Sequence, residues 1–164
     1  MIKIDYSKKF SEFFEKFEKK RKIDFIILHH IEAKSLQEAV LLLKKHQVSS
    51  HFIIGQNGKI YNLVDENDVA YHAGVSNWQG FEGLNKNSIG IEFFNTDAFG
   101  KRFSKKQLQA GVDLCLALMK KYKIAAKNVV GHSDVAYDCA TNLHNRKQDP
   151  SHLFDWKFFA ENRV

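Results

Sequence analysis

A chain of 164 residues with 44% apolar side chains can bury a core of its own, so one domain spanning residues 1–164 is expected. The formal charge of +6 favours polyanionic surroundings, but the lysines are dispersed, which indicates a solvated basic surface rather than a nucleic-acid site. Two cysteines exclude a disulfide framework, and no apolar run approaches the ~20 residues that a membrane span needs.

The first predicted element is an amphipathic helix over residues 7–21. Phenylalanines recur there at helical spacing between Lys and Glu residues, at Phe10, Phe13, Phe14 and Phe17. Acidic residues in the segment dilute the basic face that a membrane-surface helix needs, so core packing is the favoured interpretation. We therefore expect an accessory N-terminal helix that lies on the domain.

An apolar run at 24–28 predicts a strand buried on both faces, which carries His29 and His30 to its C-terminal edge. A helix over 35–45 is predicted next, because a capping box opens it and apolar residues follow at helical spacing. Residues 50–64 then predict a hairpin with an Asn-Gly turn.

Residues 70–80 are rich in Gly, Asn and aromatic side chains, which is typical of a binding loop rather than a simple connector. The next predicted strand, 88–94, contains Glu92 within an otherwise apolar run. A carboxylate in such a strand is unfavourable unless it is paired or has a function. A second capping box then opens a predicted helix over 104–122.

A last short strand at 129–131 leads into His132, after which 133–152 show no helical or strand period. A closing helix is expected at 155–161. The order strand, helix, hairpin, strand, helix, strand predicts an α/β (α+β) fold, with a mixed central β-sheet flanked by helices.

Two of the eight histidines, His29 and His132, each follow an apolar strand at its C-terminal edge, where ligand sites usually lie in such sheets. Two neutral imidazoles and one carboxylate, with a fourth position open, are a typical hydrolytic zinc set. Asp149 is a candidate for the carboxylate. The His-Glu-x-x-His motif of helix-borne metalloproteases is absent, and spacing alone is a weak indication of a metal.

Six stretches, taken in order, make a more specific pattern. They contain Ile-Leu-His-His, Ser-His-Phe-Ile-Ile, Ala-Tyr-His-Ala-Gly, Ile-Gly-Ile-Glu, Gly-His-Ser-Asp and Lys-Gln-Asp-Pro, within 26–30, 48–58, 70–78, 84–92, 130–136 and 146–156. In this ordered set the chain resembles the zinc-dependent N-acetylmuramoyl-L-alanine amidases of the type 2 group. That group shares its fold with a phage lysozyme and the peptidoglycan recognition proteins.

The resemblance implies that Zn²⁺ is held by His29, His132 and Asp149. It implies two catalytic residues, Glu92 as the carboxylate that moves the proton and Lys147 as the cation beside the developing oxyanion. The reaction implied is hydrolysis of the amide between N-acetylmuramic acid, or its anhydro form, and the L-alanine of the peptidoglycan stem peptide.

The resemblance also places His72 and Asn85 in the substrate groove. The chain departs from the family's recycling members in a longer loop, about 138–145, which leaves substrate selectivity open. Cys139 in this loop rivals Asp149, because phage and recognition members use a cysteine as third ligand. Asp149 is favoured, since Cys139 lacks the following proline and the lysine two residues before it.

Two other functions stay open at this level: a peptidoglycan-binding module of the same fold that does not cut, and a basic nucleic-acid-binding protein. The complete set of five site residues favours the enzyme, with peptidoglycan or muropeptide as partner and no nucleic acid or membrane span. Residues 1–5 show no signal-peptide features, which predicts a cytoplasmic protein as synthesised. Release by a phage holin, or a signal removed from the chain, stays open, as does the oligomeric state, with a monomer favoured.

Overall fold

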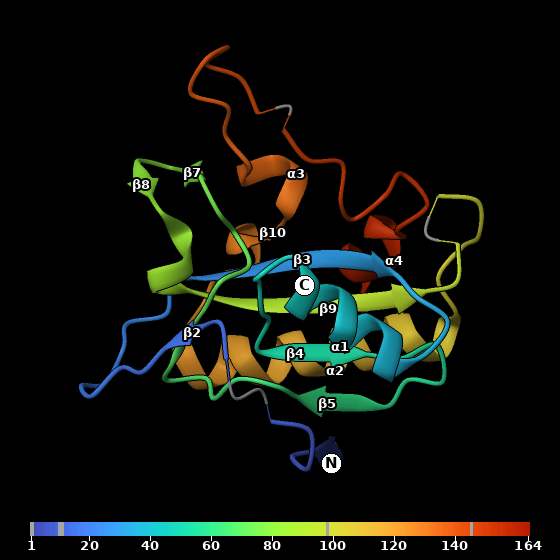
Figure 1. Cartoon of the computed structure of the whole chain (residues 1–164). Coiled ribbons are helices and arrows are strands. Elements are labelled where there is room, and N and C mark those ends of the chain that lie inside the picture. The colour runs from blue at the N-terminus through green and yellow to red at the C-terminus, as the bar shows by residue number, and fades with distance from the viewer. Residues whose placement is uncertain (1, 10–11, 98, 145) are drawn as a thin grey trace.

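The computed structural model describes residues 2–9, 12–97, 99–144 and 146–164. Six strands form its central sheet: β1 (Ile4–Asp5), β3 (Phe25–Glu32), β4 (Phe52–Ile54), β5 (Ile60–Asn62), β9 (Ser88–Asn95) and β10 (Val129–Gly131). Across the sheet the order is β1-β5-β4-β9-β3-β10, and every neighbouring pair is parallel except β4 with β5. With helices packed against it (Figure 1), this mixed sheet confirms the predicted fold class.

The long central strands β3 and β9 run in parallel, in register from Phe25 opposite Ser88 onward. This register sets His29 directly opposite Glu92. Residues paired across parallel strands project from the same face of a sheet, so these two side chains point to the same side. The predicted buried strands therefore bring a candidate metal ligand next to a candidate catalytic carboxylate.

One face of the sheet is covered by α2 (Lys105–Tyr122) and α4 (Trp156–Glu161), and α2 passes behind the sheet in Figure 1. Phe93 of β9 and Phe159 of α4 are fully buried in this layer. Gly111 of α2 lets the helix approach closely, because a Cβ there would lie 2.6 Å from Cζ of Phe93. This apolar layer supports the strands that carry the site.

The opposite face is partly covered by α1 (Leu36–Lys45), which lies in front of the sheet in Figure 1. The predicted N-cap is present, because the Ser35 hydroxyl accepts from the Glu38 N–H. The Glu38 carboxylate accepts from the Lys34 N–H, one residue before the N–H that a capping box uses. The inner side of α1 packs in one cluster with Ile53 of β4. The helix thereby forms one wall beside the carboxyl ends of β3 and β9.

The helix predicted over 7–21 is wrong. Its described residues contain no helix, and β2 (Phe14–Glu15) instead pairs antiparallel with β6 (Val69–Ala70). The apolar stripe still packs inward, since Phe13 and Phe14 contact the core cluster of α1. Phe10 lies outside the described residues.

Long-range hydrogen bonds explain why this segment is not helical. The Phe17 N–H donates to Asp68 Oδ1 at 3.2 Å, and Asn67 Nδ2 donates to the Phe17 carbonyl at 2.7 Å. The Arg21 N–H donates to Asn67 Oδ1 at 3.0 Å. These bonds satisfy backbone groups that a helix would pair internally, so tertiary contacts override the helical period.

The remaining regular elements are short: β7 (Asn77–Trp78), β8 (Phe81–Glu82), α3 (His132–Val135), and 3₁₀ turns at Leu84–Asn87 and Ala126–Asn128. The segment 133–152, expected to lack regular structure, therefore begins inside a helix. The hairpin β7–β8 lies within and just after the expected binding loop 70–80. Among the described helices, none has the length and apolar composition that a bilayer crossing requires.

Candidate active site

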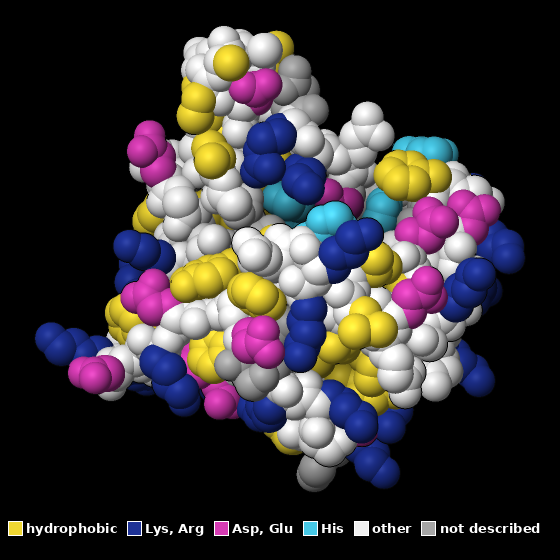
Figure 2. Space-filling view, viewed as in Figure 1, with side chains coloured by type: hydrophobic (Ala, Val, Ile, Leu, Met, Phe, Trp, Pro, Cys, Tyr) yellow, Lys and Arg dark blue, Asp and Glu magenta, His cyan; other side chains and the backbone are white. Residues whose placement is uncertain are grey.

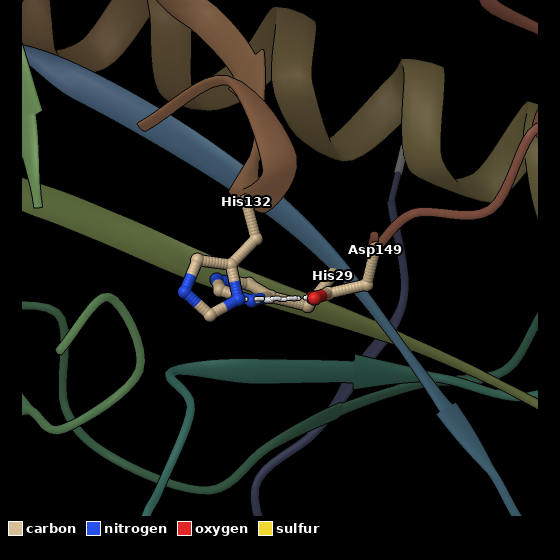
Figure 3. A group of neighbouring side chains, drawn as sticks. All are labelled: His29, His132 and Asp149. Carbon is tan, nitrogen blue, oxygen red and sulfur yellow. Dashed lines mark hydrogen bonds and ion pairs between the residues drawn. The ribbon is translucent and has the colours of Figure 1, made fainter. Parts of the chain in front are cut away.

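Three side chains from distant parts of the sequence converge at the carboxyl end of β3. His29 comes from β3, His132 is the first residue of α3, and Asp149 lies in the loop that follows (Figure 3). Oδ2 of Asp149 is 3.2 Å from Nδ1 of His29 and 3.1 Å from Nδ1 of His132. The structure thus brings together all three expected metal ligands.

The spacing and chemistry of these atoms fit a zinc ion. Ligands at about 2.0–2.1 Å around a tetrahedral zinc lie roughly 3.3 Å from one another. Across the described residues, one ligand atom from each of the three side chains lies within 4.8 Å of the others. Both imidazoles are buried, and the donor set of two nitrogens and one carboxylate oxygen is that of a hydrolytic zinc site with an open position.

The histidine ligands are held in forms that can bind a cation. Burial, together with the neighbouring His132, lowers the pKa of His29 to about 4, so the His29 ring is neutral at pH 7. Nε2 of His132 lies 3.2 Å from the Ala73 carbonyl, which can only accept a hydrogen bond. A neutral His132 therefore carries its proton on Nε2 and directs the lone pair of Nδ1 at Asp149.

Local hydrogen bonds set the position of Asp149. Its carbonyl accepts from the Ser133 N–H at 2.7 Å, which ties the loop to α3. Two residues on, the Ser151 N–H donates to Nδ1 of His30 at 2.9 Å. His30 therefore anchors the loop, and His29 alone of this pair turns a ring nitrogen to the converging atoms.

Gly131 allows the start of α3 to pack closely behind His132. A Cβ at Gly131 would lie 3.0 Å from Cδ of Pro150 and 3.2 Å from Oδ2 of Asp134. That Asp134 oxygen accepts from the Gly131 N–H at 2.7 Å. The Gly-His-Ser-Asp stretch thus fixes the backbone from which His132 projects.

Glu92 is buried and retains an unused acceptor. It is 7% exposed, and within the described part of the chain its Oε2 has no hydrogen-bond partner. Burial raises the pKa of Glu92 well above its usual value, and the charge of Asp149 raises it further. A carboxyl with a raised pKa beside a candidate metal ligand is a strong candidate for proton transfer.

Lys147 lies at the rim of the same cleft, which has a volume of about 500 Å³. Its side chain is exposed, yet its positive charge lowers the pKa of His29 and opposes the rise in the pKa of Glu92. Figure 2 shows histidine side chains at the bottom of a hollow with Lys and Arg side chains at its margin. Lys147 therefore places a positive charge in the lining of the cleft.

His72 lines the cleft, whereas Asn85 lines a smaller pocket that also includes His72, His132 and Lys147. Both residues have polar atoms that bond to the protein. Oδ1 of Asn85 accepts from the N–H groups of His72 and Ala73 at 3.0 and 2.7 Å. The ring nitrogens of His72 contact His29 and Ser88. These bonds show that both residues support the local structure of the site, and their contact with substrate stays a prediction.

Cys139 is exposed and lies outside the cluster that Asp149 forms with the two histidines. Its loop, of which Asn145 lies outside the described residues, projects above the site in Figure 1. Arg146 fastens the loop by donating from Nη2 to the Val75 carbonyl at 2.8 Å and from Nε to the Tyr137 carbonyl at 3.2 Å. These bonds hold the C-terminal end of the loop in place, and none of its described residues, 138–144, lines the cleft.

Sequence reasoning missed two residues that contact His72. The Ser88 hydroxyl lies 3.2 Å from its Nε2, and a Cβ at Gly90 would lie 2.5 Å from its Cγ. A glycine inside the apolar strand 88–94 was an available signal, because it often marks a close approach by another group. His46 and Phe99 also line the cleft, and no pattern in the sequence indicated this. They come from a helix end and a loop whose positions only the tertiary fold sets.

Comparison with known proteins finds a matching family model, curated relatives and solved structures. The family model described as N-acetylmuramoyl-L-alanine amidase matches residues 19–152. The chain is 33% identical over 153 residues to N-acetylmuramoyl-L-alanine amidase AmiD of Escherichia coli, covering 85% of this chain and 53% of AmiD. It is 40% identical over 113 residues to 1,6-anhydro-N-acetylmuramyl-L-alanine amidase AmpD of the same organism, covering 69% of this chain and 57% of AmpD.

The chain therefore spans about half the length of these curated relatives. Among solved structures, AmiD from E. coli in complex with anhydro-N-acetylmuramic acid-L-Ala-D-gamma-Glu-L-Lys superposes with a TM-score of 0.74. That match has 31% identity and covers 92% of this chain and 61% of the AmiD chain.

Proposed function

The chain belongs to the N-acetylmuramoyl-L-alanine amidase family, and from this premise we propose that it is an amidase acting on peptidoglycan or its fragments. The bond cut is the amide between N-acetylmuramic acid, or its 1,6-anhydro form, and the L-alanine of the stem peptide. The observation that carries the proposal is the meeting of His29, His132 and Asp149 in one cleft with Glu92 and Lys147. Residues 1–164 act as one catalytic domain in this proposal.

The proposed cofactor is Zn²⁺, with His29, His132 and Asp149 as its ligands. When bound, zinc supplies Lewis acidity and lowers the pKa of a coordinated water from 15.7 to about 7. The chain's own part is to keep the His29 ring neutral by burial and to hold all three ligand residues in the lining of the cleft.

Glu92 moves the proton in this mechanism. Its carboxylate takes a proton from the attacking water as the water oxygen bonds to the lactyl carbonyl carbon. It then gives that proton to the nitrogen of L-alanine as the carbon–nitrogen bond breaks. The raised pKa of Glu92 suits the second step, and the nearby charge of Lys147 favours the ionised form that the first step needs.

Lys147 stabilises the negative charge that grows on the lactyl carbonyl oxygen. A well-placed donor in such a site contributes about 3–4 kcal/mol to the transition state. Its exposed position in the lining of the cleft suits this role, because a flexible lysine there can approach a substrate that enters from solvent.

A non-catalytic peptidoglycan-binding module of the same fold is the alternative. It would need the cleft but neither a complete ligand set nor a buried carboxyl beside it. All five groups are present and face one cleft, which favours the enzyme.

The experiment is a digestion of soluble anhydro-muropeptide, with the products identified by mass spectrometry. We expect two products, the free stem peptide that begins with L-alanine and the intact sugar, and we expect a chelator to stop their formation. If the protein binds the muropeptide equally well with and without the chelator and releases no peptide, it is a binding module and the proposal fails. A parallel digestion of intact sacculi shows which form of substrate is cut faster.

A further inference from the structure

A buried chain of hydrogen bonds runs from the backbone to His29. The Ser88 hydroxyl lies 2.5 Å from the Leu84 carbonyl, and Nε2 of His72 lies 3.2 Å from the Ser88 oxygen. On the other side of its ring, Nδ1 of His72 lies 3.1 Å from Nε2 of His29. All three side chains are buried, so water does not compete for these bonds.

The direction of each bond follows from the first. A carbonyl oxygen can only accept, so the Ser88 hydroxyl uses its one proton on Leu84, and its oxygen must accept from Nε2–H of His72. A neutral His72 then has a lone pair on Nδ1, which accepts from Nε2–H of His29. His29 is left with its lone pair on Nδ1, the atom that faces Asp149.

Gly90 makes room for this arrangement. A Cβ at Gly90 would lie 2.5 Å from Cγ of His72 and 2.7 Å from its Cδ2, so any other residue would displace the ring. Gly90 precedes Glu92 by two positions on β9, and both therefore face the site. Strand β9 thus provides both the Glu92 carboxyl and the space at Gly90 for the His72 ring, which contacts His29.

We propose that His72 is a positioning residue, which acts with Ser88 to fix the tautomer and orientation of His29 so that Nδ1 points to the metal. Both nitrogens of His72 are engaged by the protein, so it acts through His29. Partners of this kind are common around metal-ligating histidines, and their loss typically lowers metal affinity about 10–100-fold. The inference rests on the proposed function only for the identity of the metal.

The tautomer of His29 can be measured directly by ¹⁵N NMR of the imidazoles in the zinc-free full chain. We expect the wild-type His29 ring to carry its proton on Nε2. In His72→Phe the acceptor is gone, and the proton should move toward Nδ1, where the Asp149 carboxylate accepts it. A wild-type ring protonated on Nδ1, or a tautomer unchanged in His72→Phe, overturns the proposal.

Zinc affinity, measured by competition with a chelator, is the second readout. We expect His72→Phe to lower it about 10–100-fold. His72→Asn should recover much of the loss, because its Oδ1 can accept from Nε2–H of His29. Ser88→Ala changes the volume little and should lower affinity by less than His72→Phe. If His72→Phe does not fold, an unchanged tautomer and affinity in Ser88→Ala overturn the proposal.

His51→Asn is the matched control. His51 is equally buried and its ring centroid lies 5.6 Å from that of His72, but it bonds to the Gly90 N–H and the Asp68 carbonyl. The folded variant should keep wild-type zinc affinity, and a loss equal to that of His72→Phe would contradict a specific role for His72. Neither readout needs a muropeptide, so a failure of the proposed hydrolysis leaves this test intact.

Discussion

Asp149→Ala is expected to lower the affinity for Zn²⁺ by more than about 100-fold, beyond the 10–100-fold typical of residues that only orient ligands. Asp149 supplies the single anionic atom of the set, and its Oδ2 lies within 3.2 Å of both imidazole nitrogens. Without Asp149, only the two neutral imidazole nitrogens remain. Release of stem peptide should therefore stop at zinc concentrations that are sufficient for the wild type. Zinc binding is measured by chelator competition and by metal content after dialysis.

Cys139→Ser is the matched control for this prediction, because a cysteine after the second histidine is the rival third ligand. Cys139 is exposed on the projecting loop, so its substitution should leave zinc content and turnover unchanged. Loss of the metal in Cys139→Ser together with its retention in Asp149→Ala would contradict the ligand assignment.

Glu92→Gln is expected to keep its zinc and to lose about 10²–10⁴-fold in turnover, the usual contribution of a general acid–base group. The amide has the same shape as the carboxyl but cannot accept the proton from water. Glu92→Ala should behave in the same way. Turnover and zinc content are measured on the same samples, and a variant with near wild-type turnover would remove Glu92 from the mechanism.

The pH dependence of unfolding distinguishes the cost of ionising the buried Glu92 carboxyl from effects of Glu92→Gln that do not depend on pH. Burial raises the pKa of Glu92 in the folded chain, whereas the unfolded carboxyl ionises near its usual 4.5. As pH rises above that value the unfolded state loses its proton first, so the folded wild type loses stability. In zinc-free protein, the unfolding midpoint of Glu92→Gln minus that of the wild type should therefore be larger at pH 8 than at pH 5. An equal difference at both pH values would contradict the raised pKa.

The chain order of β3, α1, β4, β5, β9, α2 and β10 was predictable because each has a local signal, whereas the two-residue edge strand β1 was not predicted. Continuous apolar runs mark β3 and β9, and capping boxes mark the starts of α1 and α2. The helix over 7–21 failed for a reason that local patterns do not contain. Its backbone bonds to Asp68 and Asn67, which lie about fifty residues away in the sequence.

Local patterns predicted only some of the candidate site residues. Strand ends pointed to His29 and His132, but only the resemblance singled out Asp149 and Lys147 in a segment without a period. The position of His72 was not predictable, because it depends on the space above Gly90 and on a hydroxyl that faces inward from the start of β9. Spacing along a chain does not determine which atom of a ring faces which neighbour.

Zinc titration of the metal-free protein tests the central claim most directly. The chain is stripped with a chelator, its residual metal is measured, and Zn²⁺ is added back in steps while release of stem peptide from anhydro-muropeptide is followed. Release should be absent without metal and should rise in proportion to zinc until one ion is bound per chain. Full release by the metal-free chain, or none by the chain that holds one zinc, would contradict a zinc amidase built on His29, His132 and Asp149.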